Sequence, residues 1–269
     1  MIEMVLQERM NKMNRMIAIA NQKGGVGKTT TAINLAACLA ERGKKVLLID
    51  MDSQGNTTSG LGFEKNEMEN TLYEVFRDEI DIREAIHKVE HCFDCLDLIP
   101  ANMNLAGAEI ELITQTNMQY ILKEKIKDIR DEYDFIVVDC PPALGMLTVN
   151  AMTAADSVLV PIQCEFYALD GLSQLIHTIE MIRKNLNPSL YIEGIVFTMY
   201  DARTNLSLQV VENVKDNLKQ SIYKTIIPRN VRLAEAPSHG LPINLYDKRS
   251  TGAEAYHLLA EEVILKEEE

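Results

Sequence analysis

Hydrophobic residues along the chain follow two alternating patterns. Short runs rich in β-branched residues are followed by longer stretches in which apolar residues recur every three or four positions. The first pattern is typical of strands covered on both faces and the second of amphipathic helices, so their alternation predicts βαβ units. The expected strands are Ile17–Asn21, Lys45–Asp50, Leu96–Pro100, Phe135–Asp139, Ser157–Ile162, Ile192–Met199 and Tyr223–Ile227. The expected helices include Thr29–Arg42, Asn117–Glu132, Leu169–Asn185, Leu206–Gln220 and Ala253–Leu265.

This order of elements predicts an α/β fold with a doubly wound, mostly parallel, twisted sheet and helices on both faces. The length of 269 residues is large for one domain but common for α/β folds with one core, so a single domain is expected. We divide the chain into a short N-terminal extension (1–15), the main domain (16–265) and an acidic tail (266–269).

Composition narrows the class of protein. Hydrophobic residues make up 46% and charged residues 25%, as in ordinary globular domains. The 27 basic against 40 acidic residues give a net charge of −13, which excludes a surface that is basic throughout, so any DNA contact has to be local. The first sixteen residues lack the apolar run of a secretory signal, and no apolar run approaches the length of a membrane span. We therefore expect a cytoplasmic protein whose five cysteines are reduced thiols.

The strand Ile17–Asn21 leads into a glycine-rich segment that opens the next helix. Gly24, Gly25 and Gly27 let the backbone curl with its N–H groups pointing inward, at the positive end of that helix. A plain glycine turn would not require Gly-Lys-Thr at the start of a helix, so we interpret the segment as a phosphate-binding loop. Its expected phosphate-binding residues are Lys23, Gly24, Gly25, Val26, Gly27, Lys28, Thr29 and Thr30.

The side chains of this loop predict a bound nucleotide with Mg²⁺. Lys28 supplies a point charge for the β- and γ-phosphates, and Thr29 offers a hydroxyl to the metal. The usual pattern G-x-x-x-x-G-K-[ST] is missed at one position, because residue 22 is Gln. A second lysine, Lys23, follows that glutamine.

Three carboxylates follow two of the expected strands. Asp50 and Asp52 come at the end of the second strand, and Asp139 closes a later one. The carboxyl ends of strands in a doubly wound sheet face the phosphates, so these side chains can reach the metal's water shell and an attacking water. The alternatives are a strand-end cap for Asp50 and a merely solvated strand end for Asp139.

The segment from Lys23 to Thr30 resembles the deviant Walker A motif of the ParA/MinD group of P-loop ATPases. Three further segments extend the resemblance to the chromosome-partitioning ParA proteins of the Soj type, over essentially the whole chain from Met16 to about Leu265. These segments are Asp50 to Asn56, Val137 to Pro142 and Pro228 to Ser238.

The resemblance implies an ATPase with weak intrinsic activity, using ATP and Mg²⁺. In the family, the lysine that matches Lys23 reaches across a dimer to the partner's nucleotide, as a cationic finger that neutralises charge on the transferred phosphoryl group. Lys28 is then catalytic as well as phosphate-binding, and Asp52 positions the attacking water. Asp139 matches the Walker B carboxylate and holds Mg²⁺ together with Thr29 and Asp50.

The resemblance also places the base and a DNA surface. Pro228, Arg229 and Asn230 are expected to flank the adenine, with Asp201 as a weaker candidate at the base edge. Relatives bind double-stranded DNA without sequence preference as ATP dimers, and a ParB-type centromere-binding partner stimulates hydrolysis and release. Six basic residues against three acidic ones between Thr198 and Ala234 allow a local basic face. The DNA-contact candidates are Arg203, Lys215, Lys219, Lys224 and Arg232, with surface ion pairs as the alternative.

Two other functions compete with a nucleoid-associated partitioning ATPase. A MinD-like membrane ATPase that positions cell division would need a basic amphipathic C-terminal helix, whereas residues 260–269 carry five Glu and one Lys. An electron-transfer or cluster-delivery P-loop protein would need a pair of cluster ligands that the sequence does not offer. The single C-x-x-C of Cys92 and Cys95 likewise lacks the second pair that a zinc site needs. The partitioning ATPase is the reading that the residues favour.

Overall fold

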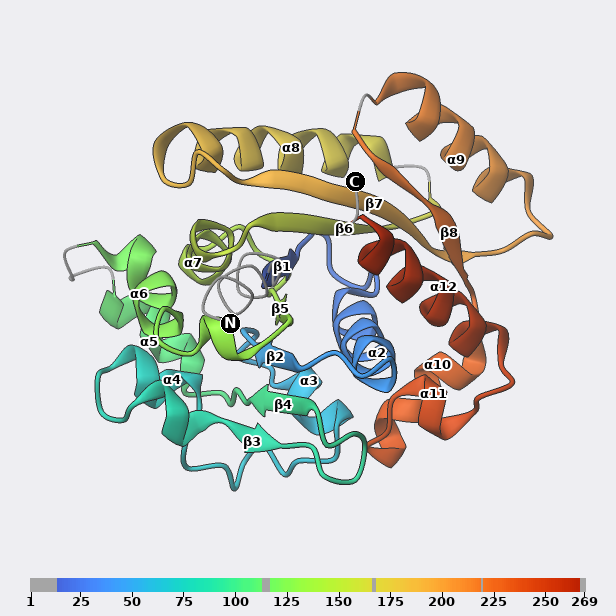
Figure 1. Ribbon diagram of the computed structural model, residues 1–269. Helices are drawn as coiled ribbons and strands as arrows, with labels where there is room; N and C mark the ends of the chain where they lie inside the picture. Colours follow the sequence, from blue (N-terminus) through green and yellow to red (C-terminus); the bar gives the residue numbers. More distant parts are fainter. Residues whose placement is uncertain (1–13, 113–116, 166–167, 219, 267–269) are drawn as a thin grey trace, which may run out of the picture.

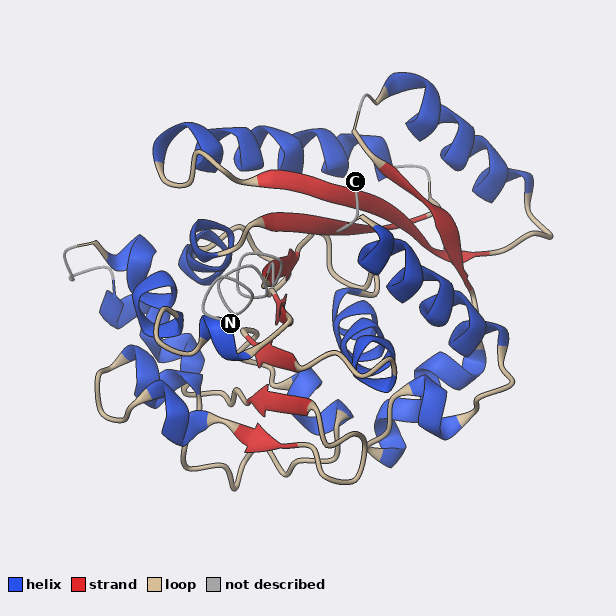
Figure 2. Ribbon diagram, in the orientation of Figure 1, coloured by secondary structure: helices blue, strands red, loops and turns tan. Residues whose placement is uncertain are grey.

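The computed structural model describes residues 14–112, 117–165, 168–218 and 220–266. Within these residues, eight strands form one sheet in the order β3-β4-β2-β5-β1-β6-β7-β8 (Figures 1 and 2), and only the β3–β4 pair is antiparallel. The predicted mostly parallel α/β fold is confirmed. The strands are β1 (Arg15–Ile19), β2 (Val46–Asp50), β3 (His87–Lys88), β4 (Leu96–Ile99), β5 (Phe135–Asp139), β6 (Ser157–Gln163), β7 (Tyr191–Tyr200) and β8 (Ile222–Pro228).

Helices cover both faces of the sheet. In Figure 1, α2 and α12 lie on one side of the strands, and α7 and α8 lie on the other. The α-helices are α2 (Lys28–Glu41), α3 (Asn56–Gly60), α4 (Leu72–Phe76), α5 (Leu105–Leu112), α6 (Ile121–Ile126), α7 (Met146–Ala154), α8 (Ala168–Asn185), α9 (Asn205–Asn217), α10 (Val231–Glu235), α11 (Ile243–Tyr246) and α12 (Thr251–Leu265).

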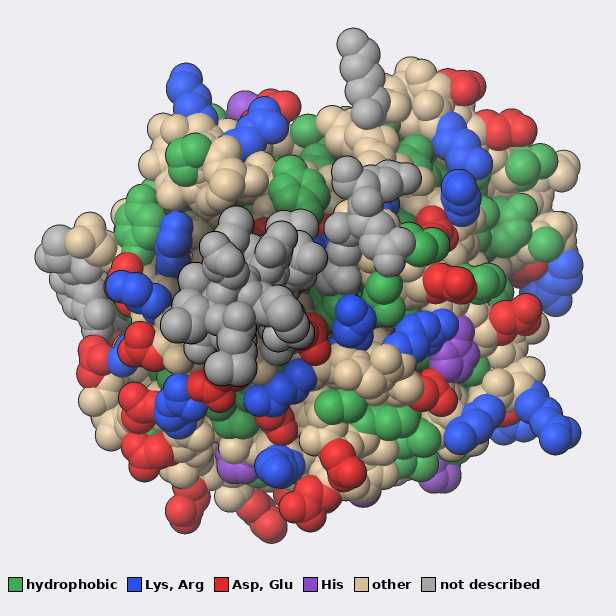
Figure 3. All heavy atoms as spheres, viewed as in Figure 1, with side chains coloured by type: hydrophobic (Ala, Val, Ile, Leu, Met, Phe, Trp, Pro, Cys, Tyr) green, Lys and Arg blue, Asp and Glu red, His purple; other side chains and the backbone are tan. Residues whose placement is uncertain are grey.

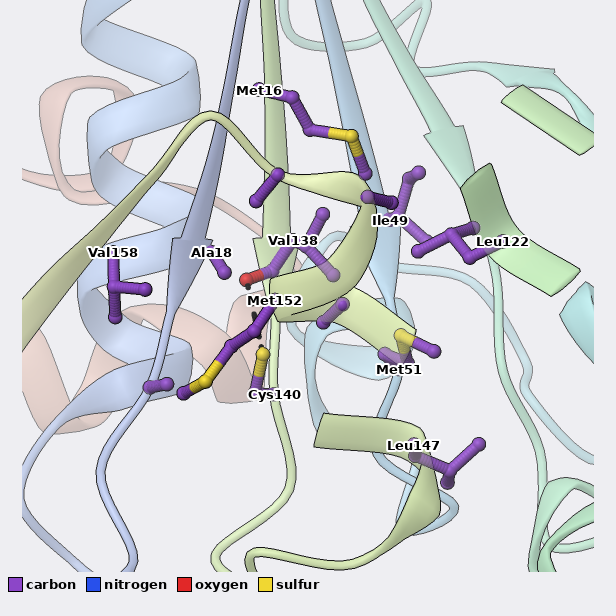
Figure 4. Close-up of a cluster of buried hydrophobic side chains, with 14 of the residues drawn as sticks. Met16, Ala18, Ile49, Met51, Leu122, Val138, Cys140, Leu147, Met152 and Val158 are labelled. Atoms are coloured by element: carbon purple, nitrogen blue, oxygen red, sulfur yellow. Dashed lines mark hydrogen bonds between the residues drawn. The ribbon is translucent and has the colours of Figure 1, made fainter. Parts of the chain in front are cut away.

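The central strand β1 divides the core into two halves. Met16 and Ala18 pack with the cluster that includes α7, as Figure 4 shows beside Val138. Ile17 and Ile19 belong instead to the cluster that includes α2 and α12. Because successive side chains of a strand point to opposite faces, burial on both faces requires apolar residues at every position. This is the physical basis of the continuous apolar runs in the sequence.

The prediction of one continuous helix at Asn117–Glu132 is wrong. The structure divides it into a 3₁₀ turn at Met118–Tyr120, the short helix α6, and a second 3₁₀ turn at Arg130–Glu132. The amide of Ile129 bonds to the carbonyl of Ile126, three residues earlier. This three-residue turn ends the α-helical hydrogen-bonding pattern, while both isoleucines stay buried in the core.

The first strand also begins earlier than expected. β1 starts at Arg15, two residues before the predicted strand and inside the segment that we had assigned to the extension. Arg15 is buried and pairs in register with Phe135 of β5. Because the strands were predicted from runs of apolar residues, the prediction left out the charged Arg15. The predicted elements likewise omit the short helices α3, α4, α5, α7, α10 and α11 and the strand β3.

Candidate functional site

The sheet topology brings the ends of three central strands to one edge. β5 lies between β2 and β1, and all three run parallel. Asp139 at the end of β5 is in register with Asp50 at the end of β2 and with Ile19 at the end of β1. The chain then crosses from β1 into the glycine-rich loop and α2. In open α/β sheets, ligands bind at the carboxyl edge, at the point where the connections that follow two neighbouring strands lead to opposite sides.

The loop between β1 and α2 needs its glycines. Gly25 and Gly27 adopt left-handed backbone conformations, with φ of 75° and 87°. Such conformations are strained for residues that carry a Cβ atom. Gly27 also caps the N-terminus of α2, a helix of 14 residues whose first amides and dipole favour an anion. The backbone therefore forms the predicted type of phosphate-binding loop.

Lys28 is the first residue of α2 and is 7% exposed. Its Nζ donates a hydrogen bond to the carbonyl oxygen of Lys23, 3.1 Å away, so the ammonium group lies against the loop. Burial lowers the pKa of Lys28, while the nearby charges of Asp139 and Asp52 oppose that shift. The cation is held inside the site by the fold rather than reaching it from solvent.

Asp50 and Asp139 are both fully buried. Burial raises the pKa of each carboxyl, and the charge of Asp139 raises the pKa of Asp50 further. Hydrogen bonds from threonine side chains oppose these shifts. Two neighbouring buried carboxyls store electrostatic repulsion when both are ionised, and a bound cation would relieve it.

The two carboxyls differ in how their oxygens are used. Asp50 Oδ2 accepts hydrogen bonds from the amide and hydroxyl of Thr58, at 2.8 and 2.7 Å, and Oδ1 accepts one from the amide of Asp52 at 3.2 Å. Asp139 Oδ2 accepts one from the Thr57 hydroxyl at 2.7 Å. Asp139 Oδ1 is buried and accepts no hydrogen bond from the described residues.

A magnesium ion fits this arrangement. The carboxylate oxygen of Asp139 that lacks a partner is a ligand type that Mg²⁺ or its water shell prefers. The Thr29 hydroxyl lies near enough to the same carboxyl to stabilise its charged form. Thr29 and Asp139 are therefore the groups that can hold the metal. The metal contact expected for Asp50 stays a prediction, since hydrogen bonds already engage both of its oxygens.

Asp52 belongs to the same site. Its side chain is 8% exposed, and its charge acts on both Lys28 and Asp139. One carboxylate oxygen accepts a hydrogen bond from the amide of Gln54 at 3.0 Å. The structure thus brings together Lys28, Asp52 and Asp139, which the sequence places far apart. Water positioning by Asp52 stays a prediction.

Lys23 contacts a residue that sequence reasoning missed. Its ammonium group forms an ion pair with Glu165, which follows the end of β6. The two side chains are 40% and 32% exposed. Gln22 ties the same loop to α8 through Gly171 and Gln174. One feature of the sequence could have indicated Glu165. It is an acidic residue just beyond a strand that is expected to run parallel to the first strand.

A cavity of about 310 Å³ opens beside the loop. Most of its wall is apolar, which suits the face of an aromatic base. Met199 contributes with a left-handed backbone (φ 51°), uncommon outside glycine and often a mark of a functional position. Its lining residues are Gly27, Thr30, Thr198, Met199, Ile227, Pro228, Arg229, Asn230, Val231, Leu233, Ala234 and Tyr256.

The residues expected around the base fall into two groups. Pro228, Arg229 and Asn230 line the cavity, although the Asn230 side chain also caps α10 by accepting from the amide of Arg232. Asp201 does not line it. Its carboxylate is held by the Arg203 guanidinium at 2.7 and 2.8 Å, and these hydrogen bonds keep the pKa of Asp201 well below its usual range. Its base-edge role stays a prediction.

The candidate DNA contacts lie on the surface. Arg203 is 85% exposed and paired with Asp201, whereas Arg232 pairs with Glu235 at 2.9 Å and with Asp247 at 3.5 Å. Lys215 on α9 and Lys224 on β8 are exposed, and Lys219 lies outside the described residues. Acidic and basic side chains are interspersed over the face in Figure 3. Both arginines thus form the ion pairs that were the alternative, and DNA contact by all five residues stays a prediction.

Comparison with known proteins decides the family. Residues 14–192 match the family described as AAA domain. The sporulation initiation inhibitor protein Soj of Bacillus subtilis is 56% identical over 251 residues, which cover 93% of this chain and 98% of that protein. The chain belongs to the ParA/Soj family of P-loop ATPases. Another ParA/Soj relative, the chromosome partitioning protein ParA of Myxococcus xanthus, is 51% identical over 94% of this chain and 89% of its own.

A solved structure agrees with the α/β fold. Cobyrinic acid a,c-diamide synthase from Mycobacterium smegmatis, crystallised with ADP and magnesium, has a TM-score of 0.81 and 36% identity, covering 93% of each chain. The relatives in sequence and the matching family model confirm the ParA/Soj resemblance stated from the motifs. In the part of the chain that the structure describes, we find no helix that is both long and apolar enough to cross a membrane.

Proposed function

We propose that this ParA/Soj protein is a Mg²⁺-dependent DNA-partitioning ATPase. Its ATP-bound dimer binds double-stranded DNA without sequence preference, and slow hydrolysis, stimulated by a ParB-type partner, releases the DNA. The observation that carries the proposal is the gathering of Lys28, Asp52 and Asp139 around a glycine loop, beside an apolar cavity. The names of the relatives from Bacillus and Myxococcus support the partitioning role.

Each part of the nucleotide has a matching part of the site. The loop amides and the N-terminus of α2 bind the phosphates, with Lys28 as their counter-charge. The base enters the cavity beside Pro228. Thr29 and Asp139 hold Mg²⁺, which supplies neutralisation of charge on the transferred phosphoryl group. Asp52 orients the attacking water from the edge of the same site.

Two variants separate binding from hydrolysis. Lys28→Ala should abolish nucleotide binding, because it removes the cation from the phosphate-binding loop. Asp52→Ala should still bind ATP and should accumulate dimers, because only water placement is lost. Size-exclusion chromatography with ATP and Mg²⁺ measures both states. An Asp52→Ala protein that binds ATP but stays monomeric would contradict the assignment.

Dimerisation depends on Lys23 in this proposal. The ion pair with Glu165 has to open before Lys23 can reach a partner's nucleotide. Lys23→Ala should therefore bind ATP with a modest loss, yet neither dimerise nor hydrolyse. Lys125→Ala is the matched control, since Lys125 also pairs with one carboxylate, that of Asp78. Normal dimerisation by Lys23→Ala would make Lys23 an ordinary loop residue.

DNA binding tests the surface candidates. Arg203 and Arg232 appear twice in a symmetric dimer, so about four phosphate contacts predict a slope of log K against log salt of roughly −3 to −4. Arg203→Glu and Arg232→Glu should weaken binding to all duplexes alike and leave dimerisation unchanged, since phosphate contacts carry no base information. Arg77→Glu, which alters a different exposed ion pair, is the control. Electrophoretic shifts that are equal with ADP, or indifferent to both substitutions, would refute this surface.

A further inference from the structure

Thr57 is a fully buried residue to which no motif assigns a role. It lies in α3, in the segment that follows Asp52, and its hydroxyl donates to Asp139 Oδ2 on β5 at 2.7 Å. The adjacent Thr58 donates to Asp50. Two consecutive threonines thus connect one short segment to the two buried carboxyls of the site.

The hydroxyl of Thr57 forms a long-range hydrogen bond rather than a local one. A buried threonine hydroxyl in a helix can satisfy itself by donating to the carbonyl four residues earlier. Thr153, equally buried in α7, does this with the carbonyl of Val149 at 2.7 Å. Thr57 is the second residue of α3, so no carbonyl of that helix lies four residues before it, and its hydroxyl donates to a carboxylate 82 residues away in the sequence. Hydrogen bonds to charged groups are stronger than those between neutral groups, so this contact restrains the orientation of Asp139.

The contact also determines which oxygen of Asp139 is left without a partner. A carboxylate is planar, so engaging Oδ2 leaves Oδ1 in a defined direction. Oδ1 is the buried oxygen that accepts no hydrogen bond from the described residues. Thr29 lies close to this same carboxyl. Thr57 therefore holds the carboxylate on one side while its other side remains available to a cation.

The segment that carries Thr57 is itself well anchored. The Thr58 hydroxyl accepts from the amide of Ala101 at 2.9 Å, in addition to its bond with Asp50. Gly55 packs so closely that a Cβ atom would lie 2.6 Å from the Ala101 carbonyl oxygen. Such close packing leaves little freedom to shift. Thr57 is thus a rigid donor rather than a side chain that merely follows Asp139.

We propose that Thr57 is a positioning residue that orients Asp139 toward Mg²⁺ in the nucleotide-bound protein. The inference rests on the proposed function, because it assumes that nucleotide and Mg²⁺ bind at this edge of the sheet. Thr57 itself touches neither the nucleotide nor the metal. Its effect should therefore appear in the metal dependence of binding rather than in binding of the nucleotide alone.

The test is a Mg²⁺ titration of the full chain with a fluorescent ADP analogue. Thr57→Val keeps the shape but removes the hydroxyl, and should need about tenfold more Mg²⁺ for half-maximal binding. Its affinity for the analogue in EDTA should stay within about twofold of the unsubstituted protein. Thr57→Ser restores the donor and should restore the metal dependence. Thr153→Val removes an equally buried hydroxyl from α7 and should behave like the unsubstituted protein.

The outcomes distinguish three cases. A folded Thr57→Val protein with an unchanged Mg²⁺ midpoint overturns the inference, as does an equal loss of affinity with and without Mg²⁺. If the unsubstituted chain fails to bind the analogue, the proposed function itself fails. Urea unfolding verifies the fold of each variant. Should Thr57→Val not fold, Thr57→Ala places no methyl group against the carboxylate and carries the same prediction.

Discussion

Two groups of buried charges lie at opposite ends of the same sheet. At the carboxyl ends of β2 and β5, Asp50 and Asp139 lie side by side and carry like charges when both are ionised. Near the amino ends of β1 and β7, Arg15 and Glu193 form an ion pair of 2.7 Å with opposite charges. Both groups are nearly inaccessible to solvent. They differ in how many of their polar atoms form hydrogen bonds or ion pairs within the protein.

The amino-end group is almost saturated. Glu193 accepts from Arg15 and Tyr223 on one oxygen and from Ser157 and Tyr191 on the other. Arg15 also donates to the carbonyl of Val263 in α12, and only its Nε lacks a partner among the described residues. The carboxyl-end group keeps an unused oxygen and raised pKa values. Contacts within the fold satisfy the first arrangement, and the second leaves charge for a ligand to neutralise.

The largest effect is expected from breaking the amino-end pair. Glu193→Ala leaves Arg15 charged and buried without its partner, and should lower the free energy of unfolding by about 3–5 kcal/mol. Urea unfolding measures the loss. Glu132→Ala, which opens the exposed pair with Arg83, is the control and should leave the urea midpoint nearly unchanged. Equal effects of the two substitutions would remove the distinction between the two ends of the sheet.

The carboxyl-end pair predicts a pH dependence of the nucleotide-free protein. The folded state retains protons on Asp50 and Asp139 above the ordinary carboxyl pKa of 3.8, where the unfolded chain has released them. Unfolding then releases protons, so stability falls as the pH rises above 3.8, by up to about 1.4 kcal/mol per pH unit for one titrating carboxyl. Unfolding in EDTA between pH 5 and pH 8 tests the sign. A rise in stability across that range would contradict it.

Removing one of the two like charges should stabilise the empty protein. Asp139→Asn keeps an acceptor for Thr57 and eliminates repulsion with Asp50, so the free energy of unfolding at pH 8 should rise by about 1–2 kcal/mol. The pH dependence should flatten as well. Mg²⁺-dependent binding of nucleotide should be lost in the same variant. Opposite changes in stability and binding are the signature of a functional carboxylate, and a loss of both would indicate a structural one.

The smallest effect concerns the rim of the amino-end group. Tyr191 is 46% exposed and donates to Glu193 at 3.2 Å. Tyr191→Phe removes this one donor while Ser157 still serves the same oxygen. The free energy of unfolding should fall by about 0.5–1.5 kcal/mol, measured by urea unfolding. A loss as large as that of Glu193→Ala would show that the network is not held mainly by the charge pair.

Sequence reasoning reached the parts of the site that lie within one motif or at a strand end. The glycine loop and the carboxylates Asp50 and Asp139 follow from apolar runs that stop at a polar residue, and parallel strands bring those ends together. Thr57, Glu165 and Glu193 were not found, because each acts through a partner 82 to 178 residues away. Such pairings depend on strand order and on side-chain direction, and neither is encoded in a local pattern.

The ion pair between Lys23 and Glu165 has a thermodynamic consequence for association. In the proposed mechanism, Lys23 gives up its ion pair with Glu165 when it forms a contact across the dimer. The dimer contact therefore replaces an existing contact. The net gain is the difference between two electrostatic attractions, and added salt weakens both. Association should therefore depend less steeply on ionic strength than the charge of the lysine suggests. Glu165 and the partner's nucleotide then compete for Lys23. ATP and ADP are distinguished by whether the nucleotide attracts Lys23 more strongly than Glu165 does.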